Sequence, residues 1–369
     1  MLNSARSLEP QINPANGITF LLDWELTMKC NLDCSYCPVG IHGGHDNSTK
    51  HPPLAECLKT IKFMFEYVDL YMNIKKSKNK QVILNVYGGE SLHHPDILEI
   101  LQQLQHYYKP YTAKWNLVTT VTTNAIVSKE KFKQIAQYVD NFTLSYHTES
   151  SEKQKAQYIN NALYLKKINK PFKCIVLMNP YEFNDAENMA KWCADNDINH
   201  LPRQLDNLET HHYDAKQIIW LNQLYNKKSF NATVELDTTQ PIMYAQGRAC
   251  CGGRQLCANQ DYKSRHFFVY NRFPDWYCSV NEYFVFIKQV NGEIYTNKDC
   301  KMSFDGTVAP IGHLNDTEKL LSYTRNHLQN GTLPIIQCKK INCICGLCAP
   351  KAKELDEFKS IMLKYRHEK

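Results

Sequence analysis

The sequence predicts an α/β fold, in which repeated strand–helix units build a parallel sheet and a smaller cysteine-rich region follows. Two observations carry this prediction. Residues 17–205 alternate short apolar or β-branched runs with longer segments of helical character, a pattern typical of βα units. Near residue 206 this alternation stops, and the chain becomes rich in Gly and Cys further on. We therefore expect a second region there.

Six strands are expected in the first region, each a short run of apolar and β-branched residues. They are Thr19–Leu26, Gln81–Tyr87, Trp115–Thr122, Asn141–Tyr146, Phe172–Met178 and Ile198–Gln204. The segments between them include three expected helices, Pro53–Asn73, Pro95–Tyr108 and Lys129–Val139. In the second of these, apolar residues recur at helical spacing, at Ile97, Leu98, Leu101 and Leu104. Each strand is therefore expected to lead into a crossover helix.

The second region begins with a polar, aromatic-rich stretch, His211–Lys228, that predicts a helix. Further on, Glu282–Gln289 and Ile294–Thr296 predict a β-hairpin, because Asn291-Gly292 between them is a strong tight-turn signal. We expect five regions: a leader at 1–16, a core at 17–205, a helical linker at 206–246, a cysteine-rich region at 247–350 and a C-terminal helix or tail at 351–369.

Composition and charge narrow the class of protein. The net charge of +6 arises from 43 basic and 37 acidic residues without a long block of one sign, so nucleic acid is not expected as a partner. No apolar run approaches the ~20 residues that cross a bilayer, and residues 1–6 lack the apolar core of a secretory signal. We expect a cytoplasmic protein without a membrane partner.

The chain contains 15 cysteines. In a reducing compartment clustered cysteines bind metal more often than they form disulfides. Three of them lie at Cys30–Cys37 and nine at Cys250–Cys348. The isolated Cys57, Cys174 and Cys193 are expected to be small buried apolar side chains.

The first cysteine group has the spacing C-x3-C-x2-C, at Cys30, Cys34 and Cys37, directly after the first expected strand. Three thiolates from one loop can hold three irons of a cubane cluster and leave the fourth iron open, whereas electron-transfer clusters usually take four cysteines. Structural zinc usually takes four ligands from two separated pairs, so a single triplet fits zinc poorly. The open iron is where a small molecule could bind.

This triplet, with the aromatic Tyr36 just before the third cysteine, resembles the signature of the radical S-adenosylmethionine (AdoMet) superfamily. The resemblance implies a partial (β/α)6 TIM-like barrel and a catalytic [4Fe-4S] cluster held by Cys30, Cys34 and Cys37. It also implies that AdoMet binds the open iron and is cleaved reductively to a 5′-deoxyadenosyl radical, which takes hydrogen from a substrate. An electron donor such as flavodoxin or ferredoxin is then expected as a partner.

Further motifs extend the resemblance to the following strands. Gly88-Gly89-Glu90 ends the second expected strand and is similar to the family motif that holds the AdoMet amino group, with the carboxylate facing the ammonium. Asn124 and Ser145, at the ends of the third and fourth strands, lie where family members bind the ribose and carboxylate; strand-end caps and turns are the alternative reading. The cofactor-binding residues implied are thus Tyr36, Gly88, Gly89, Glu90, Asn124 and Ser145.

The later cysteines resemble the SPASM or twitch extensions of this family, which hold auxiliary iron–sulfur clusters. The resemblance implies one or two such clusters, although Cys300 lies further from Gly292 than the family pattern has it and the terminal spacing is shortened. A zinc ribbon remains the alternative, and the role of Cys250 and Cys251 is open. The ligands implied are Cys278, Cys300, Cys338, Cys343, Cys345 and Cys348.

Enzymes with such extensions often modify peptides or proteins. The resemblance therefore implies a maturase-like enzyme that acts on a peptide or protein side chain. Two alternatives stay open: a radical AdoMet enzyme acting on a nucleoside, sugar or amino acid, and a non-catalytic zinc or iron–sulfur protein.

Overall fold

The computed structural model of the 369-residue chain describes its βα core and several parts of the second region. The described residues are 18–37, 50–74, 80–205, 211–228, 277–278, 280, 283–296, 310–330, 336–337, 351–352, 354–356 and 359–360. The expected leader, 1–16, and most of the expected linker, 206–246, lie outside them.

All six expected strands are present, with ends within two residues of those predicted. They lie parallel and in chain order. Their bounds are β1 (Ile18–Thr27), β2 (Lys80–Gly88), β3 (Asn116–Thr123), β4 (Asn141–Tyr146), β5 (Phe172–Met178) and β6 (His200–Gln204). The prediction of an α/β fold with a parallel sheet is confirmed.

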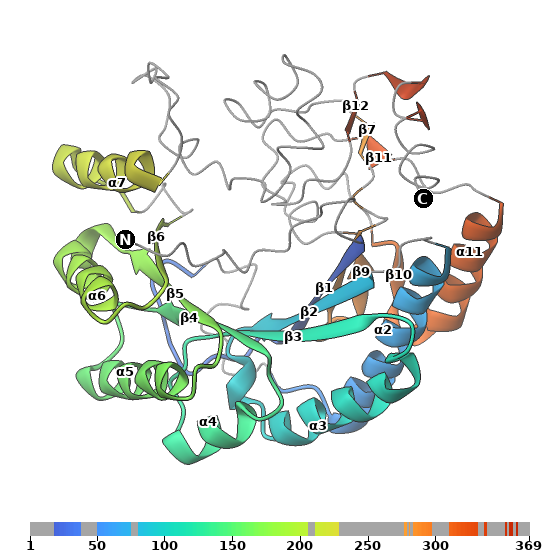
Figure 1. Ribbon diagram of the computed structural model, residues 1–369, viewed down its shortest axis with the longest axis horizontal. Helices are drawn as coiled ribbons and strands as arrows, with labels where there is room; N and C mark the ends of the chain where they lie inside the picture. Colours follow the sequence, from blue (N-terminus) through green and yellow to red (C-terminus); the bar gives the residue numbers. More distant parts are fainter. Residues whose placement is uncertain are drawn as a thin grey trace.

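Helices connect the strands and line the convex side of the curved sheet (Figure 1). A further helix, α7 (Ala215–Lys228), follows β6 within the predicted stretch. The crossover helices are α2 (Leu54–Ile74), α3 (Ile97–Tyr108), α4 (Lys129–Ile135), α5 (Glu152–Lys167) and α6 (Phe183–Asp195). Short 3-10 turns lie before and after α3, at Ser91–His93 and Lys109–Tyr111, and another lies before α6, at Pro180–Glu182.

Alternation of side chains along each strand separates the two faces of the sheet. On β1, Phe20, Leu22, Trp24 and Leu26 belong to the main apolar core with the helices. Their neighbours on the strand, among them Asp23, therefore point to the concave face. The apolar face fixes the register, because a slip by one residue would turn these four side chains away from the helices.

The predicted hairpin is confirmed, and it extends the core sheet. Its strands β8 (Phe284–Lys288) and β9 (Glu293–Tyr295) are antiparallel, while β8 pairs in parallel with β1, from Leu21 opposite Phe284 to Glu25 opposite Lys288. A further strand, β10 (Gly312–His313), pairs with β9. The sequence did not indicate this pairing. The physical reason is that β1 would otherwise be an open edge of a buried sheet.

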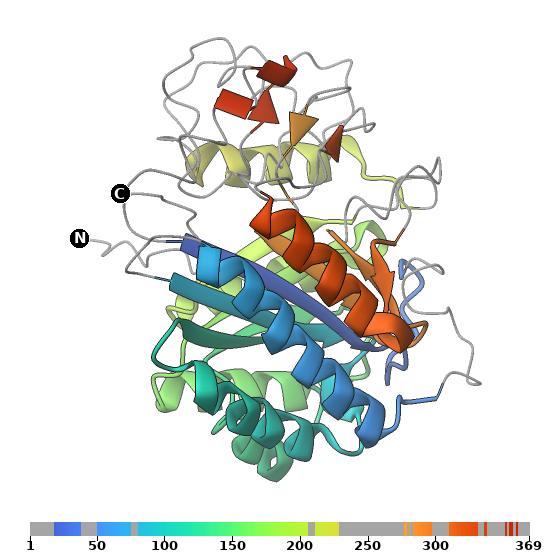
Figure 2. The ribbon, with the colours of Figure 1, turned by 90° about the vertical axis from the view of Figure 1, so that its right-hand side faces the viewer.

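A helix that the sequence reasoning did not identify, α11 (Thr317–Gln329), follows β10 and a short 3-10 turn. It packs against α2, and the two helices run side by side in Figure 2. Leu320 and Leu321 bury its apolar face in the main core. Trp24 of β1 donates a 2.9 Å hydrogen bond through Nε1 to Oε1 of Gln289, just after β8. The chain beyond residue 280 thus completes the core on the β1 side.

A second, three-stranded antiparallel sheet has the order β11–β7–β12, with β7 (Tyr277–Cys278) in the middle. Cys278 lies opposite Ile336 of β11 (Ile336–Gln337) and Lys351 of β12 (Lys351–Ala352). The other cysteines of the later group, including Cys250 and Cys251, lie outside the described residues. Among them are the expected ligands Cys300, Cys338, Cys343, Cys345 and Cys348.

Over the described residues, none of the helices combines the length and the apolar character that a bilayer crossing requires.

Candidate active site

The carboxyl ends of the parallel strands meet at one rim of the sheet, the usual place for a site in a βα barrel. The loop after β1 carries Cys30, Cys34 and Cys37 along this rim. Four further connections reach it: the Gly-Gly-Glu turn after β2, Asn124 after β3, the loop after β4 and Asn179 after β5. The rim therefore brings together parts of the chain that are about 150 residues apart.

The Gly-Gly-Glu turn lies directly against the chain that enters the cysteine loop. The backbone N–H of Gly89 donates to the carbonyl of Thr27 at 2.7 Å, and that of Glu90 donates to Lys29 at 2.9 Å. A Cβ atom on Gly88, whose φ is +153°, would lie 2.0 Å from the Thr27 oxygen, and one on Gly89 would lie 2.4 Å from the Lys29 oxygen. Only glycine allows the two segments to approach this closely.

Glu90 is buried, and the chain itself supplies donors to its carboxylate. Oε1 accepts from the hydroxyl of Thr123 at 2.7 Å and from the N–H of Leu92 at 2.9 Å, and Oε2 accepts from the N–H of Asn124 at 2.6 Å. Burial raises the pKa of Glu90 despite these three hydrogen bonds. We expected this carboxylate to face an ammonium group. In the structure it joins the end of β2 to the end of β3.

Asn124 connects the end of β3 to the cysteine loop. Its Nδ2 donates to Oδ1 of Asn31 at 2.7 Å, and Asn31 in turn donates to the carbonyl of Ile126 at 3.3 Å. Ser145 is half-buried, and its neighbours Leu144 and Tyr146 pack into the main core. Side-chain alternation therefore points Ser145 to the concave face, where the expectation had it. Its part in binding a ligand stays a prediction.

The three thiols of the loop share a poorly solvated environment. Burial raises the pKa of Cys30 to about 11, and burial together with the nearby Cys30 raises the pKa of Cys34 and of Cys37 to about 12. Three thiolates this close together therefore require cationic compensation, which iron supplies. Within the described residues no three His, Cys, Asp or Glu side chains converge tightly enough to bind a single metal ion. A cubane makes no such demand, because each thiolate binds its own iron. The donor set fits a cluster.

Tyr36 is buried beside the second cysteine and is held by a histidine from the β4–α5 loop. Its hydroxyl lies 3.0 Å from Nδ1 of His147, and the two rings are stacked, with centroids 6.0 Å apart. The same Nδ1 lies 3.3 Å from Sγ of Cys34. The His211 ring also packs against Tyr36 in a T-shaped arrangement, with ring centroids 5.9 Å apart. Cys34, Tyr36 and His147 thus form one contact group at the centre of the site.

Glu149, on the same β4–α5 loop, forms hydrogen bonds with Ser35 of the cysteine loop. Its Oε2 accepts from the N–H of Ser35 at 2.7 Å, and Oε1 accepts from the Ser35 hydroxyl and from Nδ2 of Asn179 at 3.1 Å. The sequence reasoning did not select Asn31, His147, Glu149 or Asn179. The sequence could have indicated His147, Glu149 and Asn179, because each lies within a few residues of the carboxyl end of an expected strand.

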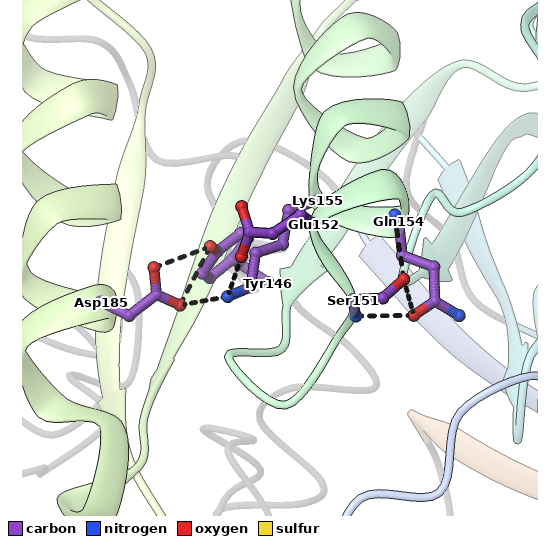
Figure 3. A network of polar contacts seen from close by, with 6 residues as sticks. All are labelled: Tyr146, Ser151, Glu152, Gln154, Lys155 and Asp185. Atoms are coloured by element: carbon purple, nitrogen blue, oxygen red, sulfur yellow. Dashed lines mark hydrogen bonds and ion pairs between the residues drawn. The ribbon is translucent and has the colours of Figure 1, made fainter.

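The β4–α5 loop, residues 147–151, is anchored at both ends (Figure 3). At the strand end, the hydroxyl of Tyr146 donates to Asp185 of α6 at 3.1 Å, and Asp185 also pairs with Lys155 of α5 at 3.2 Å. At the helix end, Ser151 and Gln154 form a reciprocal capping box that starts α5. His147 and Glu149 therefore project from a loop whose ends are fixed.

Comparisons with known proteins find similarity over the segment that carries this site. The family model of the radical SAM superfamily matches residues 24–193, from within β1 to within α6. A search of curated proteins finds no match. The solved structure of native anSMEcpe with bound AdoMet and Cp18Cys peptide is similar over 95% of this chain and 96% of that chain, with 14% sequence identity and a TM-score of 0.51.

A second solved structure, that of Streptococcus suis SuiB bound to its precursor peptide SuiA, is similar over 85% of this chain, with 15% identity and a TM-score of 0.51. The match covers 66% of the SuiB chain. At identities this low, the structural similarity shows a shared fold and nothing further. It confirms the predicted partial barrel. The match to the segment that carries the cysteine loop and the rim identifies residues 24–193 as a radical SAM domain.

Proposed function

We propose that Cys30, Cys34 and Cys37 hold the catalytic [4Fe-4S] cluster, and that the enzyme takes a hydrogen atom from a peptide or protein side chain. The observation that carries the proposal is the packing of Gly88 and Gly89 directly against the chain that enters the cysteine loop, in which Cys34 is buried. Bound there, the cluster and AdoMet supply a 5′-deoxyadenosyl radical. The chain positions and shields them.

Individual rim residues have separate parts in this proposal. Gly88 and Gly89 lack side chains, so the backbone after β2 can lie close to the amino group of AdoMet. Asn124 fixes the start of the cysteine loop through Asn31. Ser145 presents a hydroxyl on the concave face for the ribose or carboxylate. Tyr36 packs beside Cys34 and keeps water from the thiol side of the cluster.

The proposed substrate class rests on the second region. The later cysteines resemble a SPASM or twitch extension, and both proteins of similar fold described above were solved with peptides. Cys278 sits in the central strand of the small sheet, and β11 and β12 flank the chain segment that contains Cys338 and Cys348. These features support an auxiliary cluster near Cys278. Flavodoxin or ferredoxin is the proposed electron donor.

The cleavage reaction is tested with anaerobically reconstituted protein, by measuring iron, sulfide and release of 5′-deoxyadenosine from AdoMet under a strong reductant. Cys34→Ala should abolish the release. Cys57→Ala is the matched control, because Cys57 is fully buried in the helix-side core, and it should retain the release. Full activity in Cys34→Ala, or a colourless zinc protein without release, would reject the proposal.

The substrate class needs a separate experiment. Peptides encoded beside the gene should be co-expressed with the enzyme and examined by intact mass; a mass change that depends on Cys34 supports a peptide substrate. Cys345→Ala should spare AdoMet cleavage and reduce this modification, because an auxiliary site would serve substrate turnover. Turnover of a nucleoside, sugar or amino acid with no peptide modified would favour the small-molecule alternative.

A further inference from the structure

The β4–α5 loop places two groups of opposite electrostatic character beside the same cysteine. His147 brings Nδ1 to 3.3 Å from Sγ of Cys34 and to 3.0 Å from the hydroxyl of Tyr36. Glu149 contacts Ser35, the next residue, through both carboxylate oxygens, and its charge acts on Cys34.

A cluster-bound cysteine sulfur is a thiolate, which only accepts hydrogen bonds. Two donors face Cys34: the hydroxyl of Tyr36, which hydrogen-bonds to the sulfur, and Nδ1 of His147 when it carries hydrogen. When Nδ1 carries the hydrogen, the positive end of the His147 N–H dipole faces both the Cys34 sulfur and the Tyr36 oxygen. With hydrogen on Nε2 instead, Nδ1 would accept from Tyr36 and draw its hydroxyl away from the sulfur.

Hydrogen bonds to cluster sulfurs and nearby charges set the reduction potential of an iron–sulfur cluster. One-electron reduction adds negative charge to the cluster, so a donor on the sulfur stabilises the reduced form and a neighbouring carboxylate destabilises it. Glu149 is exposed, which lets solvent and salt screen its charge. His147 is half-buried and in direct contact with the sulfur, so its effect should be the larger one.

We propose that His147 and Glu149 are positioning residues that set the reduction potential of the cluster in opposite directions. His147 donates from Nδ1 to the Cys34 sulfur and raises the potential, whereas the Glu149 carboxylate lowers it while holding Ser35 in place. The inference rests on the proposed function, because it takes Cys34 as a cluster ligand.

The test is an equilibrium redox titration of the reconstituted holoenzyme with dithionite and mediator dyes, followed by the electron paramagnetic resonance signal of the reduced cluster. His147→Leu should lower the midpoint potential. The expected effect is a tenfold fall in the ratio of reduced to oxidised cluster at a fixed applied potential, which is 59 mV for one electron. His147→Asn should restore the wild-type value, because its amide nitrogen can donate from about the position of Nδ1.

Glu149→Gln should shift the potential upward by a smaller amount, and this shift should shrink as ionic strength rises, since screening acts on an exposed charge. The His147→Leu shift should not respond to salt. Iron and sulfide contents, measured for each variant, show whether the cluster is fully retained, and titrations are compared between samples of equal content.

Four outcomes are decisive. An unchanged potential in His147→Leu with the cluster retained overturns the inference. A rise in that variant also overturns it, because it means that Nδ1 accepts from Tyr36 and that loss of His147 frees the hydroxyl for the sulfur. Wild-type protein that binds no cluster, or a cluster retained unchanged in Cys34→Ala, would instead contradict the proposed function itself.

Discussion

At the scale of single residues, the site depends on close approach and on buried polar contacts. The two glycines after β2 touch the backbone before the cysteine loop, and Glu90 links β2 to β3. None of these contacts is made to a cysteine. Substitutions at these positions should therefore alter the geometry of the rim directly and affect catalysis only through that change.

Gly88→Ala should destabilise the protein strongly. The added Cβ would lie 2.0 Å from a backbone oxygen of Thr27, at a φ of +153° that only glycine adopts readily. We expect the free energy of unfolding in urea to fall by at least ~2 kcal/mol. Gly312→Ala is the control, because its Cβ would meet side-chain atoms of Leu320 and not a backbone oxygen. Equal losses in the two variants would contradict this account.

Glu90→Gln should change how stability depends on pH. Burial raises the pKa of Glu90 above its ordinary value of 4.5, so the folded state holds a proton that the unfolded state releases. The wild-type protein should therefore lose stability relative to Glu90→Gln as pH rises from 4.5 toward the folded-state pKa. Urea unfolding of both proteins over this range measures the difference. A difference that is constant with pH would show that the pKa of Glu90 is not raised.

At the scale of elements, the rim is made rigid by the way loops join strands to helices. The β4–α5 loop is the clearest case, because Tyr146 anchors its first end and the capping box of α5 anchors its last. The loop carries two residues that contact the cysteine loop. The stability of a helix start is thereby coupled to the geometry of a site on the neighbouring loop.

Ser151→Ala removes the capping box of α5 and should cost about 1 kcal/mol of stability. It should also weaken iron retention under chelator challenge, because it loosens the loop that carries His147 and Glu149. Ser128→Ala, which removes the comparable cap of α4, should cost a similar free energy without affecting iron retention. Equal iron loss in both variants would mean that general stability, and not the β4–α5 loop, governs retention.

At the scale of the whole molecule, the second region contributes to the core. The strands β8–β10 extend the sheet on the β1 side, and α11 covers α2. The division into five regions remains a prediction, yet its core and cysteine-rich parts share one sheet. The cysteine-rich region and the cysteine loop are thus joined through β1, the strand that leads directly to Cys30.

A chain ending at residue 276 should not fold as a stable monomer. It would lack β8, leaving β1 as an open apolar edge, and it would lack α11, exposing part of α2. Size-exclusion chromatography should show aggregated material, whereas full-length Cys278→Ala should elute as the wild-type protein does. A soluble, folded fragment of 276 residues would show that the core is complete without the second region.

The sequence by itself determined the six parallel strands, the cysteine triplet and the Gly-Gly-Glu turn. Strands and helices follow from local periodicity. The three cysteines lie within eight residues, so they can be recognised as a ligand set without knowledge of any long-range contact. Only the tertiary structure decided that the hairpin joins β1, that Glu90 binds across to β3 and that His147 and Glu149 reach the cysteine loop. These contacts join residues from 33 to more than 250 positions apart. Hydrophobic patterning shows which face of a strand or helix is buried, but it does not show which distant segment packs against that face. Contacts between distant segments are therefore visible only in the folded structure.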